Sequence, residues 1–159
     1  MALSLNLTPF QFGKFEGKRR VASFGYQYNY STQRLEPADA LPAWILPIAA
    51  AIERADRLPE GSIGHMLFTE YEAGTGIGWH KDKKQFDKVF GLSLGSACSF
   101  RFRKKSGTKW ERYTLLAEPR SLYTMTDESR HVWEHSIPPV KSTRYSVTFR
   151  TMASAHAPR

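Results

Sequence analysis

Residues 99–116 read SFRFRKKSGTKWERYTLL, and this stretch predicts two short β-strands separated by a turn. Phe100 and Phe102 alternate with arginines, which is the period of two expected of a strand with one buried face. The Ser-Gly pair at 106–107 is a turn signal, and a second extended run covers 110–116. The local pattern is therefore that of an all-β region.

Similar short runs lie on both sides of this stretch, from about residue 62 onward. They cover Leu67–Tyr71, Phe90–Leu94, Arg120–Met125, His131–Ile137 and Arg144–Met152. Together with the first two runs they suggest about eight short strands, a number and spacing typical of a sandwich, a barrel or a jelly roll. Periodicity alone does not choose among these three architectures.

Residues 1–60 have a different pattern, in which short extended pieces accompany one predicted helix. Apolar residues recur at helical spacing from Leu41 to Ile52. Pro47 is compatible with that helix only in its first turn, where its missing N–H is not needed. The following AAAIERAD at 49–56 consists mostly of good helix formers.

The composition favours a single domain covering residues 1–159. No apolar run approaches the roughly 20 residues that cross a bilayer, and residues 1–12 do not resemble a secretion signal. Cys98 is the only cysteine, which excludes an internal disulfide framework and a multi-cysteine zinc site. We therefore expect a cytoplasmic protein that does not associate with membranes.

The net charge of +8 comes largely from three clusters of basic residues. These clusters are either solvated loops and strand faces or an electrostatic footprint for a polyanion such as nucleic acid. Charge alone leaves both interpretations open. The clusters are Lys14–Lys18–Arg19–Arg20, Lys81–Lys83–Lys84–Lys88 and Arg101–Arg103–Lys104–Lys105–Lys109.

A candidate metal site begins in the segment YEAGTGIGWHKDKK at 71–84. In a strand, His80 and Asp82 would project to the same side and could reach one ion. His135 is the candidate for the third ligand. Two histidines and one carboxylate are the ligand set of non-haem Fe(II) oxygenases, although zinc hydrolases use the same residue types. The other histidines are expected to be structural or exposed: His65, His131 and His156.

The C-terminal run RYSVTFR at 144–150 supplies a second candidate feature. With a period of two, Arg144, Ser146, Thr148 and Arg150 share one face of a strand. If the opposite face packs against the helix, both arginines point inward. Two guanidinium groups can bind a short dicarboxylate through paired hydrogen bonds. Without such packing, both arginines would extend to solvent.

Taken together, HKD at 80–82, WEHSIP at 133–138 and RYSVTFR at 144–150 resemble the AlkB family of 2-oxoglutarate-dependent dioxygenases. The resemblance covers roughly residues 10–152, and FQFGKFEGKRRVASFGYQY at 10–28 is similar to the family's substrate-lid region. It implies a mainly β fold, the double-stranded β-helix or jelly roll, with one or two packing helices. The jelly roll would cover about 62–152, and residues 1–36 would form a shortened lid.

The resemblance also implies roles for individual residues and the cofactors Fe(II), 2-oxoglutarate and O2. The iron ligands, which are also the catalytic residues, would be His80, Asp82 and His135. Arg144 would bind the distal carboxylate of 2-oxoglutarate, and Arg150 would lie near the end that chelates iron. Further co-substrate contacts would come from Tyr71, Thr69 and Ser146, the last two standing where the family's bacterial archetype has asparagines.

For the substrate, the resemblance favours oxidative dealkylation of N-methylated bases in DNA or RNA, a repair reaction on a flipped or single-stranded base. Contacts to nucleic acid are then expected from Arg19, Arg20, Tyr26, Lys84 and Arg130, and Lys14, Lys18, Tyr28 and Tyr30 could add phosphate and stacking contacts. Lys84 stands at or beside a position where repair enzymes of the family carry an acid. This difference favours the alternative of a hydroxylase or demethylase for a protein or small molecule. A non-catalytic jelly-roll binding module is a third alternative, and a monomer is expected.

Overall fold

The computed structural model describes residues 5–12 and 14–154, so His156 lies outside the described residues. In chain order the elements are β1 (Thr8–Phe12), β2 (Phe15–Phe24), β3 (Tyr26–Asn29), β4 (Arg34–Pro37), α1 (Leu46–Ala55), β5 (Ile63–Tyr71), β6 (Ile77–His80), β7 (Phe86–Gly95), β8 (Cys98–Ser106), β9 (Lys109–Ala117), β10 (Ser121–Met125), α2 (Asp127–His131), β11 (Glu134–Ile137) and β12 (Arg144–Met152). The predicted hairpin at 99–116 corresponds to β8 and β9, which pair antiparallel.

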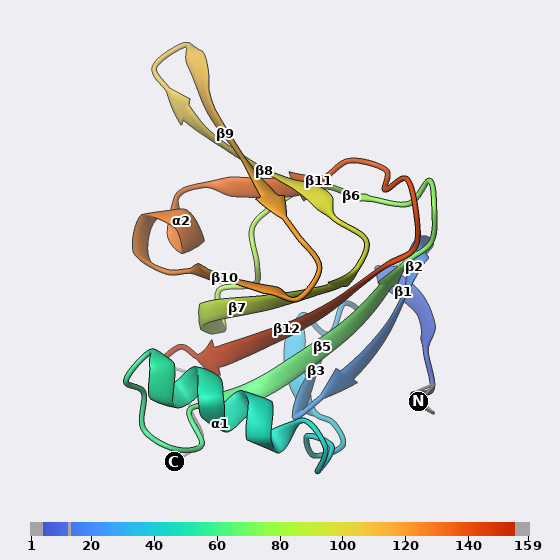
Figure 1. Cartoon of the computed structure of the whole chain (residues 1–159), viewed down its shortest axis with the longest axis vertical. Helices are drawn as coiled ribbons and strands as arrows, with labels where there is room; N and C mark the ends of the chain where they lie inside the picture. Colours follow the sequence, from blue (N-terminus) through green and yellow to red (C-terminus); the bar gives the residue numbers. More distant parts are fainter. Residues whose placement is uncertain (1–4, 13, 155–159) are drawn as a thin grey trace.

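Two antiparallel sheets face each other and form the body of the molecule (Figure 1). The larger sheet has the strand order β1-β2-β5-β12-β7-β10, and the smaller has the order β6-β11-β8-β9. A separate two-stranded sheet joins β3 and β4. The sequence prediction of a mainly β jelly roll with one or two helices is confirmed.

Helix α1 lies on the outer face of the six-stranded sheet, on the side away from the smaller sheet (Figure 1). Pro47 lies in its first turn, as predicted. The buried side chains of Ala49 and Ile52 belong to one core cluster with Val147 and Phe149 of β12. One face of β12 is therefore covered by the helix, and its other face points into the space between the sheets.

A second core cluster occupies the space between the two sheets. It joins Tyr71 and Val89 of the larger sheet to Phe100 and Ile137 of the smaller one. This cluster fixes the two sheets relative to each other around the candidate site. Neither helix in the described ranges has the length and apolar character to cross a bilayer.

The prediction of a continuous strand from His131 to Ile137 was wrong at its beginning. His131 ends the short helix α2, and β11 begins only at Glu134. The backbone N–H of Thr126 donates to Ser129 Oγ at 3.0 Å. Side chains of this kind favour helix starts over strands because they satisfy backbone groups at the first turn.

Candidate active site

The three predicted metal ligands lie close together, at the end of β6 and on the neighbouring strand β11 of the smaller sheet. His80 ends β6 and lies directly opposite His135 on β11, while Asp82 follows β6 by two residues. Asp82 Oδ1 is 3.8 Å from His80 Nε2 and 3.4 Å from His135 Nε2. Ligand atoms that bind one ion at about 2.1 Å each lie no more than about 4.2 Å apart, so these two separations fit a single bound ion.

The protonation states of His80 and Asp82 also suit the binding of a divalent cation. The Nδ1 atom of His80 donates to the carbonyl oxygen of Gly78 at 2.8 Å, which leaves Nε2 free to coordinate. Burial, aided by the neighbouring His135, lowers the pKa of His80 to about 4. Burial raises the pKa of Asp82, but Arg150 and then His135 outweigh it and hold that pKa well below its usual value. The site thus presents a carboxylate together with a neutral His80.

Arg150 connects this cluster to β12. Its Nε donates to Asp82 Oδ2 at 2.6 Å, and its Nη1 lies 3.2 Å from His65 Nδ1. His65 is buried and lies beside Arg150 in the strand register. His65 was expected to be structural or exposed, and its place in the site was missed because only the register of β5 against β12 reveals it.

Arg144 lies at the other end of the same face of β12 and is fully buried. Its Nε donates to Ser93 Oγ at 3.1 Å, and its guanidinium carbon lies 5.4 Å from the centre of the Tyr71 ring. The Nη1 and Nη2 atoms of Arg144 have no hydrogen-bond partner among the described residues. A buried guanidinium with unpaired nitrogens is costly unless an anion binds it. It therefore fits the carboxylate of a small acid.

Small polar side chains lie between the two arginines. Ser146 of β12 pairs with Thr69 on β5 and with Ser93 on β7, which makes a row of three small residues across the sheet. Thr69 and Ser146 line a cavity of about 1160 Å³ that also contains the His-Asp-His cluster and Arg150. Arg144 itself does not line this cavity, but its guanidinium group faces the ring of Tyr71, which does.

Tyr123 is a further cavity residue that the sequence did not reveal. It lies directly opposite Gly91 in the pairing of β10 with β7. A side chain at position 91 would collide with the Tyr123 ring, so glycine allows that ring to cross β7 into the cavity. Burial raises the pKa of the Tyr123 hydroxyl, although the nearby Arg144 opposes this, so the group can act as a hydrogen-bond donor.

Comparison with known proteins places this arrangement in a family. The model of the 2OG-Fe(II) oxygenase superfamily matches residues 8–152. The chain belongs to this superfamily. Enzymes of this type use Fe(II), 2-oxoglutarate and O2, and the His-Asp-His cluster and the unpaired Arg144 guanidinium fit the first two. The chain is thus a 2-oxoglutarate-dependent dioxygenase.

Curated relatives narrow the family to AlkB-like oxygenases. The oxygenase is 30% identical over 148 residues to an uncharacterized protein of Acanthamoeba polyphaga mimivirus, covering 79% of this chain and 68% of the viral protein. It is 34% identical over 129 residues to the mouse protein named tRNA (carboxymethyluridine(34)-5-O)-methyltransferase ALKBH8, covering 77% of this chain and 19% of that protein. It is 30% identical over 145 residues to the Arabidopsis thaliana protein named Alkylated DNA repair protein ALKBH8 homolog, covering 76% and 42% respectively.

The mouth of the oxygenase cavity combines aromatic rings with cations. Phe10, Arg19, Tyr28, Tyr30 and Lys83 all line the cavity. The guanidinium carbon of Arg19 lies 3.9 Å from the centre of the Phe10 ring. Lys83 Nζ lies 4.5 Å from the centre of the Tyr28 ring and 4.8 Å from that of Tyr30. Arg19, one of the expected contacts to nucleic acid, therefore lies at the cavity mouth.

The other expected substrate contacts of the oxygenase do not line the cavity. Arg130 is buried and donates to the carbonyl oxygens of Lys83 and Phe86, so it holds the loop before β7. Arg20 lies one residue from Arg19 on the opposite strand face, where it pairs with Glu70. Tyr26 and Lys84 are also absent from the lining, whereas Tyr28 and Tyr30, which the sequence offered as stacking residues, line the cavity together with Lys83.

Proposed function

We propose that this dioxygenase oxidatively dealkylates an N-methylated base in single-stranded or flipped-out nucleic acid. The observation that carries the proposal is the cavity mouth, where Arg19 and Lys83 lie over aromatic rings next to the metal ligands. The names of two relatives refer to tRNA and to alkylated DNA, which supports a nucleic-acid substrate. Aromatic rings stack on exposed bases, and cations bind the phosphates on either side.

At the closed end of the site, Arg144 would bind the distal carboxylate of 2-oxoglutarate. Its two unpaired nitrogens offer the paired hydrogen bonds that a carboxylate accepts. Ser93 fixes the guanidinium through Nε, and Tyr71 and Tyr123 supply hydroxyl groups beside it. These residues orient the co-substrate along β12 toward the metal ligands.

At the other end, Arg150 positions the metal site. Its hydrogen bond to Asp82 Oδ2 leaves Oδ1 facing the two histidines. His80, Asp82 and His135 would hold Fe(II) through two imidazole nitrogens and one carboxylate oxygen. The bound iron, with 2-oxoglutarate and O2, supplies the oxidising power, while the protein supplies orientation and shields the site from water.

The lysine at position 84 bears on the choice between a nucleic-acid substrate and a protein or small-molecule substrate. Lys84 was the main argument for a protein or small-molecule substrate, because related repair enzymes carry an acid at or beside that position. In this structure Lys83, and not Lys84, lines the cavity. Its ammonium group over Tyr28 and Tyr30 can bind a phosphate next to the oxidised base.

The test is turnover of single-stranded DNA and RNA oligonucleotides that carry N-methylated bases, with Fe(II), 2-oxoglutarate and O2. We expect succinate and formaldehyde in equal amounts and the loss of a methyl group from the oligonucleotide by mass spectrometry. Asp82→Ala removes a metal ligand, so we expect it to lose this turnover by at least about 100-fold. Equal product from wild type and Asp82→Ala would contradict the assignment of the site.

The same assay separates the alternatives. If a peptide or metabolite stimulates succinate formation and no oligonucleotide does, the substrate is a protein or small molecule. If the protein binds iron and 2-oxoglutarate but oxidises no C–H bond of any substrate class, it is a binding module.

A further inference from the structure

The outer face of the smaller sheet carries a second group of cations and aromatic rings, away from the core. Phe100 stacks on His135 in the space between the sheets, so its neighbours Arg101 and Arg103 project to the opposite face. The register of β9 and β11 against β8 brings further side chains to that face. They are Glu134, Lys105, Trp110, Arg112 and Thr114.

On this face, arginines lie against tryptophan rings. The guanidinium carbon of Arg103 is 4.4 Å from the centre of the Trp79 ring and 4.3 Å from that of Trp110. Arg101 also lies over Trp79, at 5.2 Å. Trp110 is 41% exposed, so one of these rings is open to a partner. Flat guanidinium and indole groups on a sheet form a platform for stacking.

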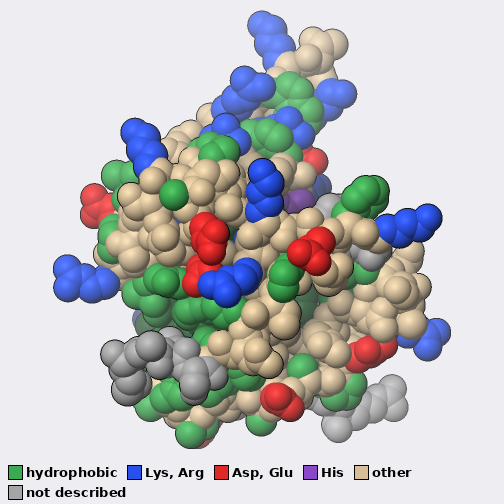
Figure 2. Space-filling model, turned by 90° about the vertical axis from the view of Figure 1, so that its right-hand side faces the viewer, with side chains coloured by type: hydrophobic (Ala, Val, Ile, Leu, Met, Phe, Trp, Pro, Cys, Tyr) green, Lys and Arg blue, Asp and Glu red, His purple; other side chains and the backbone are tan. Residues whose placement is uncertain are grey.

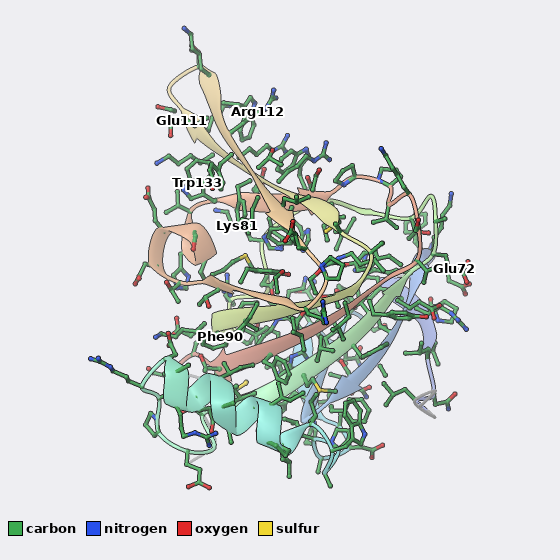
Figure 3. The ribbon with its side chains drawn as sticks, in the orientation of Figure 1. Glu72, Lys81, Phe90, Glu111, Arg112 and Trp133 are labelled. Carbon is green, nitrogen blue, oxygen red and sulfur yellow. The ribbon has the colours of Figure 1, made fainter. Side chains whose placement is uncertain are left out.

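The charge of this face is strongly positive. It carries Arg101, Arg103, Lys105 and Arg112 against the single carboxylate of Glu134, which pairs with Arg103 at 2.7 Å. Figure 3 shows Glu111 and Arg112 projecting to opposite sides of β9, so Glu111 does not neutralise this face. Figure 2 shows Lys and Arg side chains gathered at the end of the molecule that the β8–β9 hairpin forms.

Trp79 links this face to the catalytic cavity. A hollow of about 290 Å³ on the smaller sheet is lined by Trp79, Arg101, Arg112 and Thr114, together with Phe102 and Tyr113. Trp79 also lines the catalytic cavity and directly precedes the metal ligand His80. The side chain of Trp79 therefore borders both the hollow and the cavity, and an extended ligand lying in the hollow would have to pass only Trp79 to enter the cavity.

We propose that the outer face of the β6-β11-β8-β9 sheet binds a single-stranded segment of nucleic acid next to the nucleotide that enters the cavity. This inference rests on the nucleic-acid substrate proposed above and gives it a second contact surface. Arg101, Lys105 and Arg112 bind phosphates, and a base stacks on Trp110. Trp79 marks the point where the strand turns from the sheet into the cavity.

A single strand suits this surface better than a duplex. Its bases are exposed and can stack on aromatic side chains, whereas those of a duplex are already stacked on one another. The outer face offers arginines that lie against tryptophan rings on one face of a sheet, and single-strand-binding sheets likewise present rings on one face. An anionic membrane would bind the positive charges but would not stack on Trp110. Loss of the Trp110 ring should therefore weaken binding to nucleic acid and not binding to a membrane.

The test is the affinity of the full chain for a fluorescein-labelled single-stranded RNA or DNA 12-mer, measured by anisotropy over a range of salt concentrations. We expect Trp110→Ala to weaken binding by about fivefold or more, because one base–aromatic stack is lost. Trp110→Phe keeps a ring and should retain most of the affinity. Arg112→Glu should weaken binding and reduce the slope of log affinity against log salt by about 0.7 for each lost phosphate contact.

The matched control is Arg54→Glu, which makes the same charge change on α1, at the far side of the larger sheet. We expect it to bind the 12-mer as wild type does, and thermal unfolding verifies that every variant is folded. Equal weakening by Arg54→Glu and Arg112→Glu, or wild-type affinity in Trp110→Ala, overturns the inference. So does equal loss of binding by Trp110→Ala and Trp110→Phe, or tighter binding to anionic lipid vesicles than to the 12-mer.

A variant at the cavity mouth separates this inference from the proposed function. If Lys83→Glu abolishes binding while Trp110→Ala and Arg112→Glu have no effect, the nucleic-acid substrate stands and the second surface does not. If wild type binds no oligonucleotide at low salt, both proposals fail together. If Lys83→Glu and the outer-face variants each weaken binding, both stand. If the outer-face variants alone weaken it, the second surface stands and the proposed phosphate contact of Lys83 does not.

Discussion

Arg144 has the most demanding environment of any single residue in the site. It is fully buried, and its Nε donates to Ser93, while Nη1 and Nη2 are unpaired within the described residues. In a structural role, such a charge would be expected to have a carboxylate partner. The unpaired nitrogens therefore indicate a ligand carboxylate. A ligand-binding role and a structural role for Arg144 predict different effects of its replacement.

Replacing Arg144 with methionine should raise the KM for 2-oxoglutarate by about 30-fold or more, because charge-assisted hydrogen bonds to a buried carboxylate are lost. The free energy of unfolding of the protein without co-substrate should not fall, since an apolar side chain replaces an unpaired buried charge. Steady-state kinetics and urea unfolding measure the two effects. A loss of stability with an unchanged KM would make Arg144 a structural residue.

His65 should make stability depend on pH. Burial, and then Arg150, lower the pKa of His65 well below 6.5 in the folded protein. As the pH falls below 6.5 the unfolded chain takes up the proton first, so stability is lost by up to about 1.4 kcal/mol per pH unit. Urea unfolding of the metal-free protein between pH 7.5 and 5 should show a shallower decline for His65→Gln. Identical slopes for wild type and variant would refute this account.

The sequence predicted the site residues that follow from spacing within one strand. It missed the residues that reach the site only through the pairing of one strand with another. Arg144 and Arg150 follow from a period of two within one strand, and their inward direction followed from the helix that covers the other face. His65 enters the site only because β5 pairs with β12. The choice of Lys83 over Lys84 depends on the path of one loop. Neither the pairing nor the loop path can be read from local pattern.

Among the elements, β7 and β10 together shape the end of the cavity near Arg144. Gly91 of β7 allows the Tyr123 ring of β10 to cross it. Gly91→Ala should displace that ring, destabilise the protein by about 1–3 kcal/mol and raise the KM for 2-oxoglutarate. In a Tyr123→Ala background the same substitution should be nearly neutral, because the collision is gone. Additive effects in the two backgrounds would show that the contact does not matter.

The helices differ in how well local sequence predicted them. The apolar spacing and Pro47 predicted the helix, and Ala49 and Ile52 of α1 pack on β12. The helix begins at Leu46 and not at Leu41, and Ile48 of the expected apolar stripe is exposed. The start of the expected strand at His131 was wrong, because α2 is only five residues long and is set by its first-turn hydrogen bonds. Helices this short have no apolar period to recognise.

At the scale of the whole molecule, the proposed metal site joins the two sheets. His80 and His135 belong to the smaller sheet, and Asp82 is held by Arg150 of the larger sheet. A bound ion therefore stabilises the arrangement of the sheets as well as the three ligands. Any ligand that binds only the folded state stabilises it by about 2.7 kcal/mol at a concentration 100 times its Kd.

For a chain of this size that free energy corresponds to a rise in Tm of about 5–10 °C. Mn(II), used as a stand-in for Fe(II) that does not turn over, should produce this rise in the chelator-treated wild type. 2-Oxoglutarate should add a further increment only when the metal is present, because its 2-oxo acid end requires the ion. His80→Ala, which removes the most exposed of the three ligands, should abolish both increments while the metal-free variant still unfolds cooperatively. If His80→Ala showed the full Mn(II)-dependent rise in Tm, the ion would bind elsewhere, and it would not be what joins the two sheets.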